Sequence, residues 1–98
     1  MDLKIVWSLR AAAHLEDICS YISKDSITYA SVFAGKVLTI VEGLSRYPQS
    51  GRVVPEYDIK NLRERVYNNY RIVYRVKPDM LEIVAICHGA RLLKNTGF

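Results

Sequence analysis

The sequence predicts an α+β fold in which an N-terminal strand and a two-helix antiparallel hairpin pack on an antiparallel β-sheet. Three observations support this prediction: apolar residues recur with helical spacing in the first half, strand-like alternation replaces it after residue 60, and only short turns separate the later runs. A chain of 98 residues has the size of one domain, so residues 1–98 are expected to fold as a single unit. With both helices on one face, we expect the opposite face of the sheet to be left for binding.

The first half is predicted to contain a short strand and two helices. Residues 3–7 alternate as a strand does, and Ser8 can cap the helix that follows, from Leu9 to about Lys24. Asp25 or Ser26 can cap a second helix, which cannot run past Pro48. Apolar residues at spacings of three and four mark the buried side of both helices: Ala11, Leu15, Ile18 and Ile22 in the first, and Ala30, Phe33, Val37, Ile40 and Leu44 in the second.

The second half is predicted to be a loop followed by three strands. Residues 47–58 contain two prolines and a glycine without any period, which is typical of a loop. Residues 61–67 and 70–76 flank Asn68 and Asn69, which tolerate the backbone of a tight turn, so we expect a hairpin in which Tyr67 pairs with Tyr70. The connection to residues 80–87 is too short for a crossover, which predicts an antiparallel meander that the first strand could join.

This register places Glu64 one diagonal step from both Arg71 and Arg75, on the same face of the hairpin. A surface ion pair between these groups would stabilise the fold by only about 0.2–1 kcal/mol. The alternative is that the glutamate and the arginines serve a function.

The other face of the hairpin is expected to lie beneath the helices. Tyr70, Ile72 and Tyr74 of the second strand share this face. Arg63 and Arg65 fall on this face too, unless a bulge in the first hairpin strand turns them outward.

Basic residues are concentrated in the second half of the chain. Residues 1–45 contain four Lys or Arg against five Asp or Glu, whereas residues 46–98 contain ten against five. Such a field attracts nucleic acid, a ribosome surface or an acidic protein segment, without selecting among them.

Several classes of protein are not favoured by the sequence. Cys19 and Cys87 have neither CxxC spacing nor clustered histidines, so we expect buried thiols rather than a disulfide or a zinc site. No phosphate-binding loop or metalloprotease motif is present, so we expect neither a cofactor nor a metal. The N-terminus does not resemble a secretion signal, and no apolar stretch approaches the roughly 18 residues of a membrane span, so a cytoplasmic location is expected.

Four short motifs of the second half provide the most specific signal: GRVVPE at 51–56, LRE at 62–64, YRIVY at 70–74 and HGAR at 88–91. In this order, after two helices, they resemble the RelE/ParE superfamily of small bacterial toxins, and the resemblance covers nearly the whole chain. It implies two helices on a small antiparallel sheet and a toxin of a type II toxin-antitoxin pair that arrests growth. It also implies an antitoxin that is encoded beside the toxin and lies across it as a helix and an extended segment. The toxin would form a homodimer, or a heterotetramer with the antitoxin.

The superfamily contains two activities, and the resemblance favours the ParE-like one. RelE-like members cut messenger RNA on the ribosome, using two lysines before the hairpin turn, two arginines and a C-terminal tyrosine. The arginines correspond to Arg71 and Arg91, but Leu62 and Glu64 stand at the lysine positions and the terminal tyrosine is missing. LRE followed by YRIVYRV is similar instead to ParE-like members and their plasmid-stabilisation relatives, which inhibit DNA gyrase by binding and need no catalysis.

The two activities imply different site residues. A gyrase inhibitor would use basic side chains for target or partner contacts, for which the candidates are Arg52, Arg63, Arg65, Arg75, Arg91 and Lys94. A nuclease acting on translating ribosomes and messenger RNA would use Arg71, Arg91 and His88, the last as a replacement acid or base. Arg52 could instead pair only with Glu56, and His88 could be structural.

Overall fold

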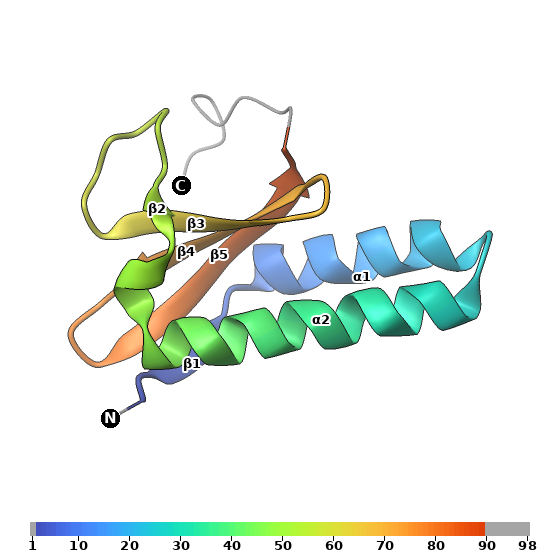
Figure 1. Ribbon diagram of the computed structural model, residues 1–98, viewed down its shortest axis with the longest axis horizontal. Coiled ribbons are helices and arrows are strands. Elements are labelled where there is room, and N and C mark those ends of the chain that lie inside the picture. The colour runs from blue at the N-terminus through green and yellow to red at the C-terminus, as the bar shows by residue number, and fades with distance from the viewer. Residues whose placement is uncertain (1, 90–98) are drawn as a thin grey trace.

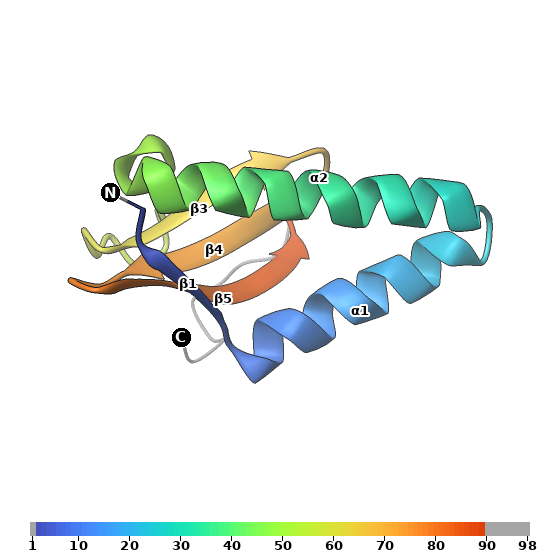
Figure 2. The same cartoon turned by 90° about the horizontal axis from the view of Figure 1, so that it is seen from below.

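The computed structural model describes residues 2–89. Two helices lie on one side of a five-stranded sheet, and the helical hairpin extends well beyond the edge of the sheet (Figures 1 and 2). The elements in chain order are β1 (Lys4–Trp7), α1 (Leu9–Ser23), α2 (Ile27–Arg46), the 3₁₀ turn η1 (Pro48–Ser50), β2 (Arg52–Val53), β3 (Leu62–Tyr67), β4 (Tyr70–Val76) and β5 (Met80–His88). The predicted fold class is confirmed.

Both helices begin at the predicted serine caps. The hydroxyl of Ser8 accepts a hydrogen bond from the Ala11 amide, and that of Ser26 accepts one from the Tyr29 amide, each at 3.0 Å. Each bond satisfies one of the amides that the first turn of a helix leaves without a partner. The local sequence therefore determines where each of the two helices begins.

The sheet has the order β1-β5-β4-β3-β2, with β1 parallel to β5 and all other neighbours antiparallel. The predicted hairpin register is confirmed, since Tyr67 pairs with Tyr70 and Glu64 with Val73. Asn68 adopts the left-handed backbone conformation expected of the turn, with φ of 52°. β3 and β4 pair without a break, so the bulge that could have turned the β3 arginines outward is absent from the hairpin.

An irregularity does occur one strand further along. Val73 pairs with Ala85 and Tyr74 with Ile83, so β5 carries Val84 as an extra residue at this point. Nearby, Nδ1 of His14 on α1 accepts a hydrogen bond from the Ile86 amide at 3.1 Å. A helix side chain thus contacts the backbone of β5 just past the place where its pairing shifts.

The main core lies between the helices and the sheet. Tyr74, Ile72 and Tyr70 face the helices as predicted, the first two fully buried and the last partly. The apolar stripes of the two helices supply the other side of this core, which also takes in Leu81, Ile83 and Ile86 of β5. The hairpin register therefore predicted correctly which β4 residues face the helices.

The opposite face of the sheet is not left bare, which corrects the expectation from the sequence. Val54 and Tyr57, in the segment between β2 and β3, pack against a second apolar cluster on that face. The other members of this cluster are Leu62, Val73, Val84, Ala85 and Cys87. Periodicity could not reveal this because the covering segment has no period of its own.

The predicted loop 47–58 also contains ordered structure. Residues 48–50 form the 3₁₀ turn, and residues 52–53 pair with β3 as a short edge strand. The buried hydroxyl of Tyr74 accepts a hydrogen bond from the Gly51 amide at 3.0 Å and donates one to the Pro48 carbonyl at 2.8 Å. A Cβ atom at residue 51 would lie 2.6 Å from the Glu64 carbonyl oxygen and closer still to this hydroxyl, so only glycine fits at this position.

Helix α2 is long and apolar enough, by length and composition alone, to cross a membrane, contrary to the expectation from the sequence. Its buried side chains explain that composition: Phe33, Val37, Val41 and Leu44 all lie in the core. We therefore interpret α2 as the core helix of this domain. Of the two cysteines, both free thiols, Cys87 is buried as predicted, while Cys19 is only partly buried.

Candidate functional site

A buried network of charged side chains lies on the face of the sheet opposite the helices. Nε of Arg71 donates to Glu64 at 2.6 Å, and its two terminal nitrogens donate to the carboxylate of Glu56 at 2.7 and 2.8 Å. Glu64 also accepts from Arg52 at 2.6 Å. Glu64 is fully buried and Arg71 is 4% exposed. The ion pair inferred from the register is therefore present, but it is a buried pair and not a surface pair.

This network fastens the segment between β2 and β3 to the sheet. Glu56 comes from that segment, Arg71 from β4, Glu64 from β3 and Arg52 from β2. The hydrogen bonds that Arg71 donates, first to Glu56 and then to Glu64, raise its pKa against the opposing effect of burial. Arg52 pairs with Glu64 and not with Glu56, so the alternative partner suggested for it from the sequence is wrong.

The basic residues predicted to contact a target differ in their surroundings. Arg52 and Arg75 each face a carboxylate, Arg75 at 3.9 Å from that of Glu82. Arg63 instead donates to the carbonyl oxygens of Gly51 at 2.9 Å and Lys60 at 3.1 Å. These bonds hold its guanidinium in place without neutralising it.

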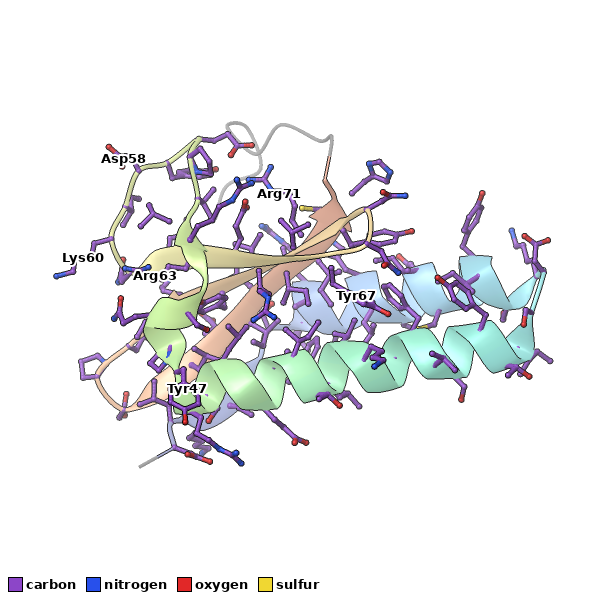
Figure 3. All side chains as sticks on the ribbon, in the orientation of Figure 1. Tyr47, Asp58, Lys60, Arg63, Tyr67 and Arg71 are labelled. Atoms are coloured by element: carbon purple, nitrogen blue, oxygen red, sulfur yellow. The ribbon has the colours of Figure 1, made fainter. Side chains whose placement is uncertain are left out.

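Arg65 lies two residues further along β3 and is exposed. Both arginines stay on the helix side of the sheet, at its outer edge, because β3 has no bulge in its pairing with β4. Burial raises the pKa of the Tyr74 phenol, against the opposing effects of the Gly51 hydrogen bond and of the positive charges of Arg63 and Arg65. Figure 3 shows Arg63 beside Lys60 at one end of β3 and Tyr67 at the other.

The candidate nuclease residues that the structure describes do not come together. Tyr70 pairs with His88, and Arg71 pairs with Cys87, so His88 and Arg71 belong to opposite faces of the sheet. His88 packs edge-on against the Tyr70 ring, with 5.8 Å between ring centroids. Arg71 lies beneath the segment that covers the other face. The predicted roles of Arg91 and Lys94 concern residues outside those that the structure describes.

The positions that correspond to the nuclease lysines are buried. Leu62 is 1% exposed and belongs to the second apolar cluster, and Glu64 lies in the charged network. A lysine at either position would have to place its charge within the protein. These positions therefore serve the packing of the sheet in this chain.

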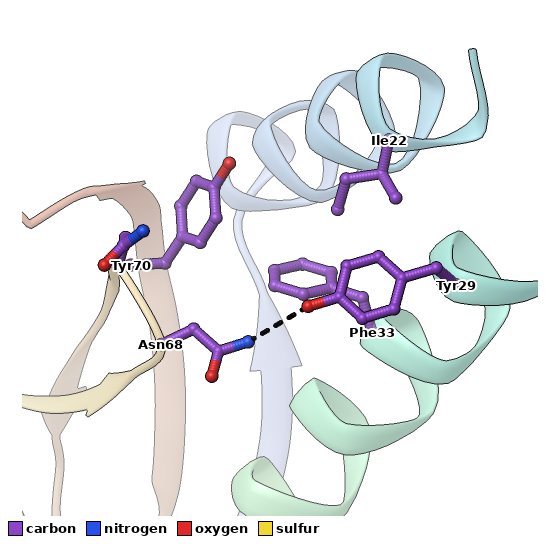
Figure 4. A pocket seen from close by; sticks show the side chains of 6 residues that line it. Ile22, Tyr29, Phe33, Asn68 and Tyr70 are labelled. Atoms are coloured by element: carbon purple, nitrogen blue, oxygen red, sulfur yellow. Dashed lines mark hydrogen bonds between the residues drawn. The ribbon is translucent and has the colours of Figure 1, made fainter. Parts of the chain in front are cut away.

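A pocket of about 460 Å³ lies where the helical hairpin meets the β3–β4 turn (Figure 4). Ile22, Tyr29 and Phe33 line it from the helices, and Asn68, Asn69 and Tyr70 line it from the turn. The Asn68 amide lies 3.5 Å from the Tyr29 hydroxyl. The sequence did not reveal this pocket, because its lining comes from segments far apart in the chain. The sequence patterns assign all of its lining residues except Tyr29 to the core or to the turn.

The fold and these features define the class of protein to which the chain belongs. Residues 5–93 match the family described as the ParE toxin of the type II toxin-antitoxin system parDE. The chain therefore belongs to this family of toxins, within the RelE/ParE superfamily. The resemblance drawn from the four sequence motifs is thereby confirmed.

Two relatives and two solved structures agree with this assignment. The chain is 38% identical over 88 residues to toxin Y4kP of Sinorhizobium fredii, which spans 88% of each chain. It is 37% identical over 90 residues to toxin RelE2 of Caulobacter vibrioides, which spans 91% of this chain and 98% of the relative. Both relatives thus carry the name of a toxin, and one of them carries a RelE name.

The fold is shared with two toxin-antitoxin structures. The chromosomal ParDE system from P. aeruginosa superposes with a TM-score of 0.72 at 20% identity, covering 88% of this chain and 95% of that chain. The RelBE2 toxin-antitoxin complex from Mycobacterium tuberculosis superposes with a TM-score of 0.61 at 18% identity, covering 90% and 99%. At these identities the likeness concerns the fold.

Proposed function

We propose that this toxin acts on DNA gyrase as a ParE-like inhibitor, by binding and without catalysing a reaction of its own. The observation that carries the proposal is the separation of Arg71 and His88 on opposite faces of the sheet. Cleavage of RNA at the ribose 2′-hydroxyl needs a base, an acid and a charge-stabilising group around one phosphate. Side chains divided between two faces do not surround one phosphate.

The burial of the charged network supports the same proposal. Arg71 already makes hydrogen bonds to two carboxylates, and Glu64 adds negative charge at a position where a nuclease needs positive charge. An arginine in this state has little capacity left to bind a substrate phosphate. The match of residues 5–93 to the ParE toxin family adds to this support.

We propose further that a cognate antitoxin, encoded beside the toxin, neutralises it by covering apolar surface of the hairpin. The pocket between Tyr29, Phe33 and Tyr70 would receive an apolar anchor side chain from that protein. The two solved structures described above are toxin-antitoxin systems, which supports such a partner.

The test is a supercoiling assay in which purified gyrase is titrated with the toxin, scoring lost supercoiling and trapped cleaved DNA together. We expect both to appear in proportion to the toxin. The matched control is the same toxin mixed beforehand with its antitoxin, which should restore supercoiling.

Unaffected gyrase would overturn the proposal, provided that the same preparation arrests growth. The RelE-like alternative would then be tested by cleavage of messenger RNA on translating ribosomes. If ribosome-dependent cleavage occurred and survived His88→Ala, it would also require a catalytic set other than Arg71, His88 and Arg91.

A further inference from the structure

The cations of the structure divide into those that face carboxylates and those that do not. Arg46, Arg52, Arg71, Arg75 and Lys77 all lie within ion-pair distance of an acidic side chain. Among residues 2–89, six cations have no such partner: Lys4 at the β1 edge, Lys24 at the hairpin tip, and Lys36, Lys60, Arg63 and Arg65. The last four lie near one another, apart from Lys4 and Lys24. The side chains of Lys36, Lys60, Arg63 and Arg65, which we call the basic flank, come from helix α2, the residue just before Asn61 and strand β3.

The packing of α2 beside β3 brings the basic flank together. Tyr29 of α2 contacts Asn68 at 3.5 Å, and Phe33 packs against Tyr67 with 5.7 Å between ring centroids, so α2 and β3 run in opposite directions. One turn further along α2 is Lys36, and two residues back along β3 is Arg65. The two exposed cations therefore lie on the same side of the Phe33–Tyr67 contact.

Arg63 extends the basic flank along β3, and hydrogen bonds hold its side chain. Its guanidinium donates to the Gly51 and Lys60 carbonyl oxygens, and no carboxylate of the described residues lies within ion-pair distance of it. The hydrogen bond from Arg63 to the Lys60 carbonyl oxygen also places Lys60 at the same end of β3, as Figure 3 shows. The result is a row of positive charge along the outer edge of the sheet, next to the partly buried ring of Tyr67.

We propose that the basic flank binds the phosphate backbone of double-stranded DNA, so that this toxin contacts DNA directly and not only gyrase. Arginine and lysine on one surface without compensating carboxylates match a regular line of phosphates. Half of the basic flank is lysine, a residue depleted at protein–protein interfaces but common at DNA interfaces. An acidic peptide strand is disfavoured because β2 already occupies the edge of β3 at Arg63 and Glu64.

The test is the binding of the intact toxin to a short labelled DNA duplex, followed by fluorescence anisotropy between about 50 and 200 mM salt, without gyrase. The variant is Lys36→Gln/Arg65→Gln, which changes two exposed side chains. The matched control is Lys4→Gln/Lys24→Gln, which removes the same charge at the opposite edge of the sheet and at the hairpin tip. Circular dichroism and thermal unfolding check that both variants fold.

The expected result is a loss of about tenfold in DNA affinity for Lys36→Gln/Arg65→Gln and a salt dependence weaker by about two phosphate contacts, with the control close to the parent. Equal losses in both variants would overturn the proposal, because net charge alone would then explain binding. A parent toxin that does not bind the duplex would overturn it too. A Lys36→Gln/Arg65→Gln variant that loses affinity for polyglutamate but keeps its affinity for DNA would also overturn the proposal. The basic flank would then be a surface that binds acidic polypeptides.

The gyrase supercoiling assay remains a separate measurement. A toxin that binds DNA through the basic flank and leaves gyrase active would contradict the proposed function alone. A toxin that inhibits gyrase and does not bind free DNA would contradict this inference alone.

Discussion

At the scale of the residue, Arg71 is defined by what surrounds it. It follows the tyrosine that begins the YRIVY motif. RelE-like members of the superfamily use the arginine at this place in the motif to cleave messenger RNA. In this chain its guanidinium is buried between Glu56 and Glu64 and ties the segment that covers the sheet to β4. The same residue type in the same motif thus serves a structural purpose in this toxin.

Arg71→Met should therefore destabilise the fold strongly. It would leave the buried Glu64 and Glu56 without their shared cation, which typically costs about 3–5 kcal/mol. Urea unfolding followed by circular dichroism measures the change in the free energy of unfolding.

Arg75→Met is the matched control, because Arg75 is partly exposed and lies 3.9 Å from Glu82. Arg75→Met should lower the free energy of unfolding by at most about 1 kcal/mol. The double variant Arg71→Met/Glu64→Leu should recover part of the stability lost in Arg71→Met. A loss below about 1 kcal/mol in Arg71→Met would contradict the structural role of the network.

At the scale of the element, sequence patterns predicted the parts whose order is local. Helical spacing gave both helices and their caps, and the Asn68–Asn69 pair gave the β3–β4 register, because short-range sterics fix both. The 3₁₀ turn, β2 and the covering segment were missed. Their positions depend on contacts with Tyr74, Glu64 and Arg71, which no periodicity encodes.

The Tyr74 hydroxyl joins η1 and β2 to the sheet, and Tyr74→Phe should weaken that connection. The variant leaves the Gly51 amide and the Pro48 carbonyl without their partner, at a cost of about 1–3 kcal/mol at neutral pH. Thermal or urea unfolding of the two proteins provides the comparison.

The difference between the parent and Tyr74→Phe should shrink at alkaline pH. Burial raises the pKa of Tyr74, so the unfolded chain loses the phenol proton near the ordinary value of about 10 while the folded protein still holds it. The stability that Tyr74 contributes is thus complete below about pH 10 and is lost as pH rises through the folded pKa. A difference that stays constant from about pH 8 to about pH 11 would contradict this account.

At the scale of the whole molecule, two surfaces of different chemistry lie on either side of the Phe33–Tyr67 contact. The pocket of aromatic and asparagine side chains faces the hairpin tip, and the basic flank follows β3 in the other direction. The pocket suits an apolar side chain and the basic flank suits phosphates. A small toxin can in this way present separate surfaces to an antitoxin and to the DNA on its target.

If the antitoxin uses the pocket, Tyr29→Ala should weaken its binding by about tenfold, which corresponds to about 1.4 kcal/mol. Tyr29 is 50% exposed, so the fold should survive the change. Isothermal titration calorimetry with the protein encoded beside the toxin measures the affinity. Tyr47→Ala, at the far end of α2 and also exposed, is the control and should bind as the parent does; equal affinity of both variants would remove the pocket from the antitoxin interface.

The parallel pairing of β1 with β5 joins residues 4–7 to residues 80–83, which are the first and the last strands among residues 2–89. The helical hairpin can form early because its contacts are local, but β1 has no strand to pair with until the ribosome has released β5. A nascent toxin therefore cannot complete its sheet until β5 has left the ribosome. The order of the strands therefore leaves a period, after translation has begun, in which the toxin is present but its sheet is not yet complete.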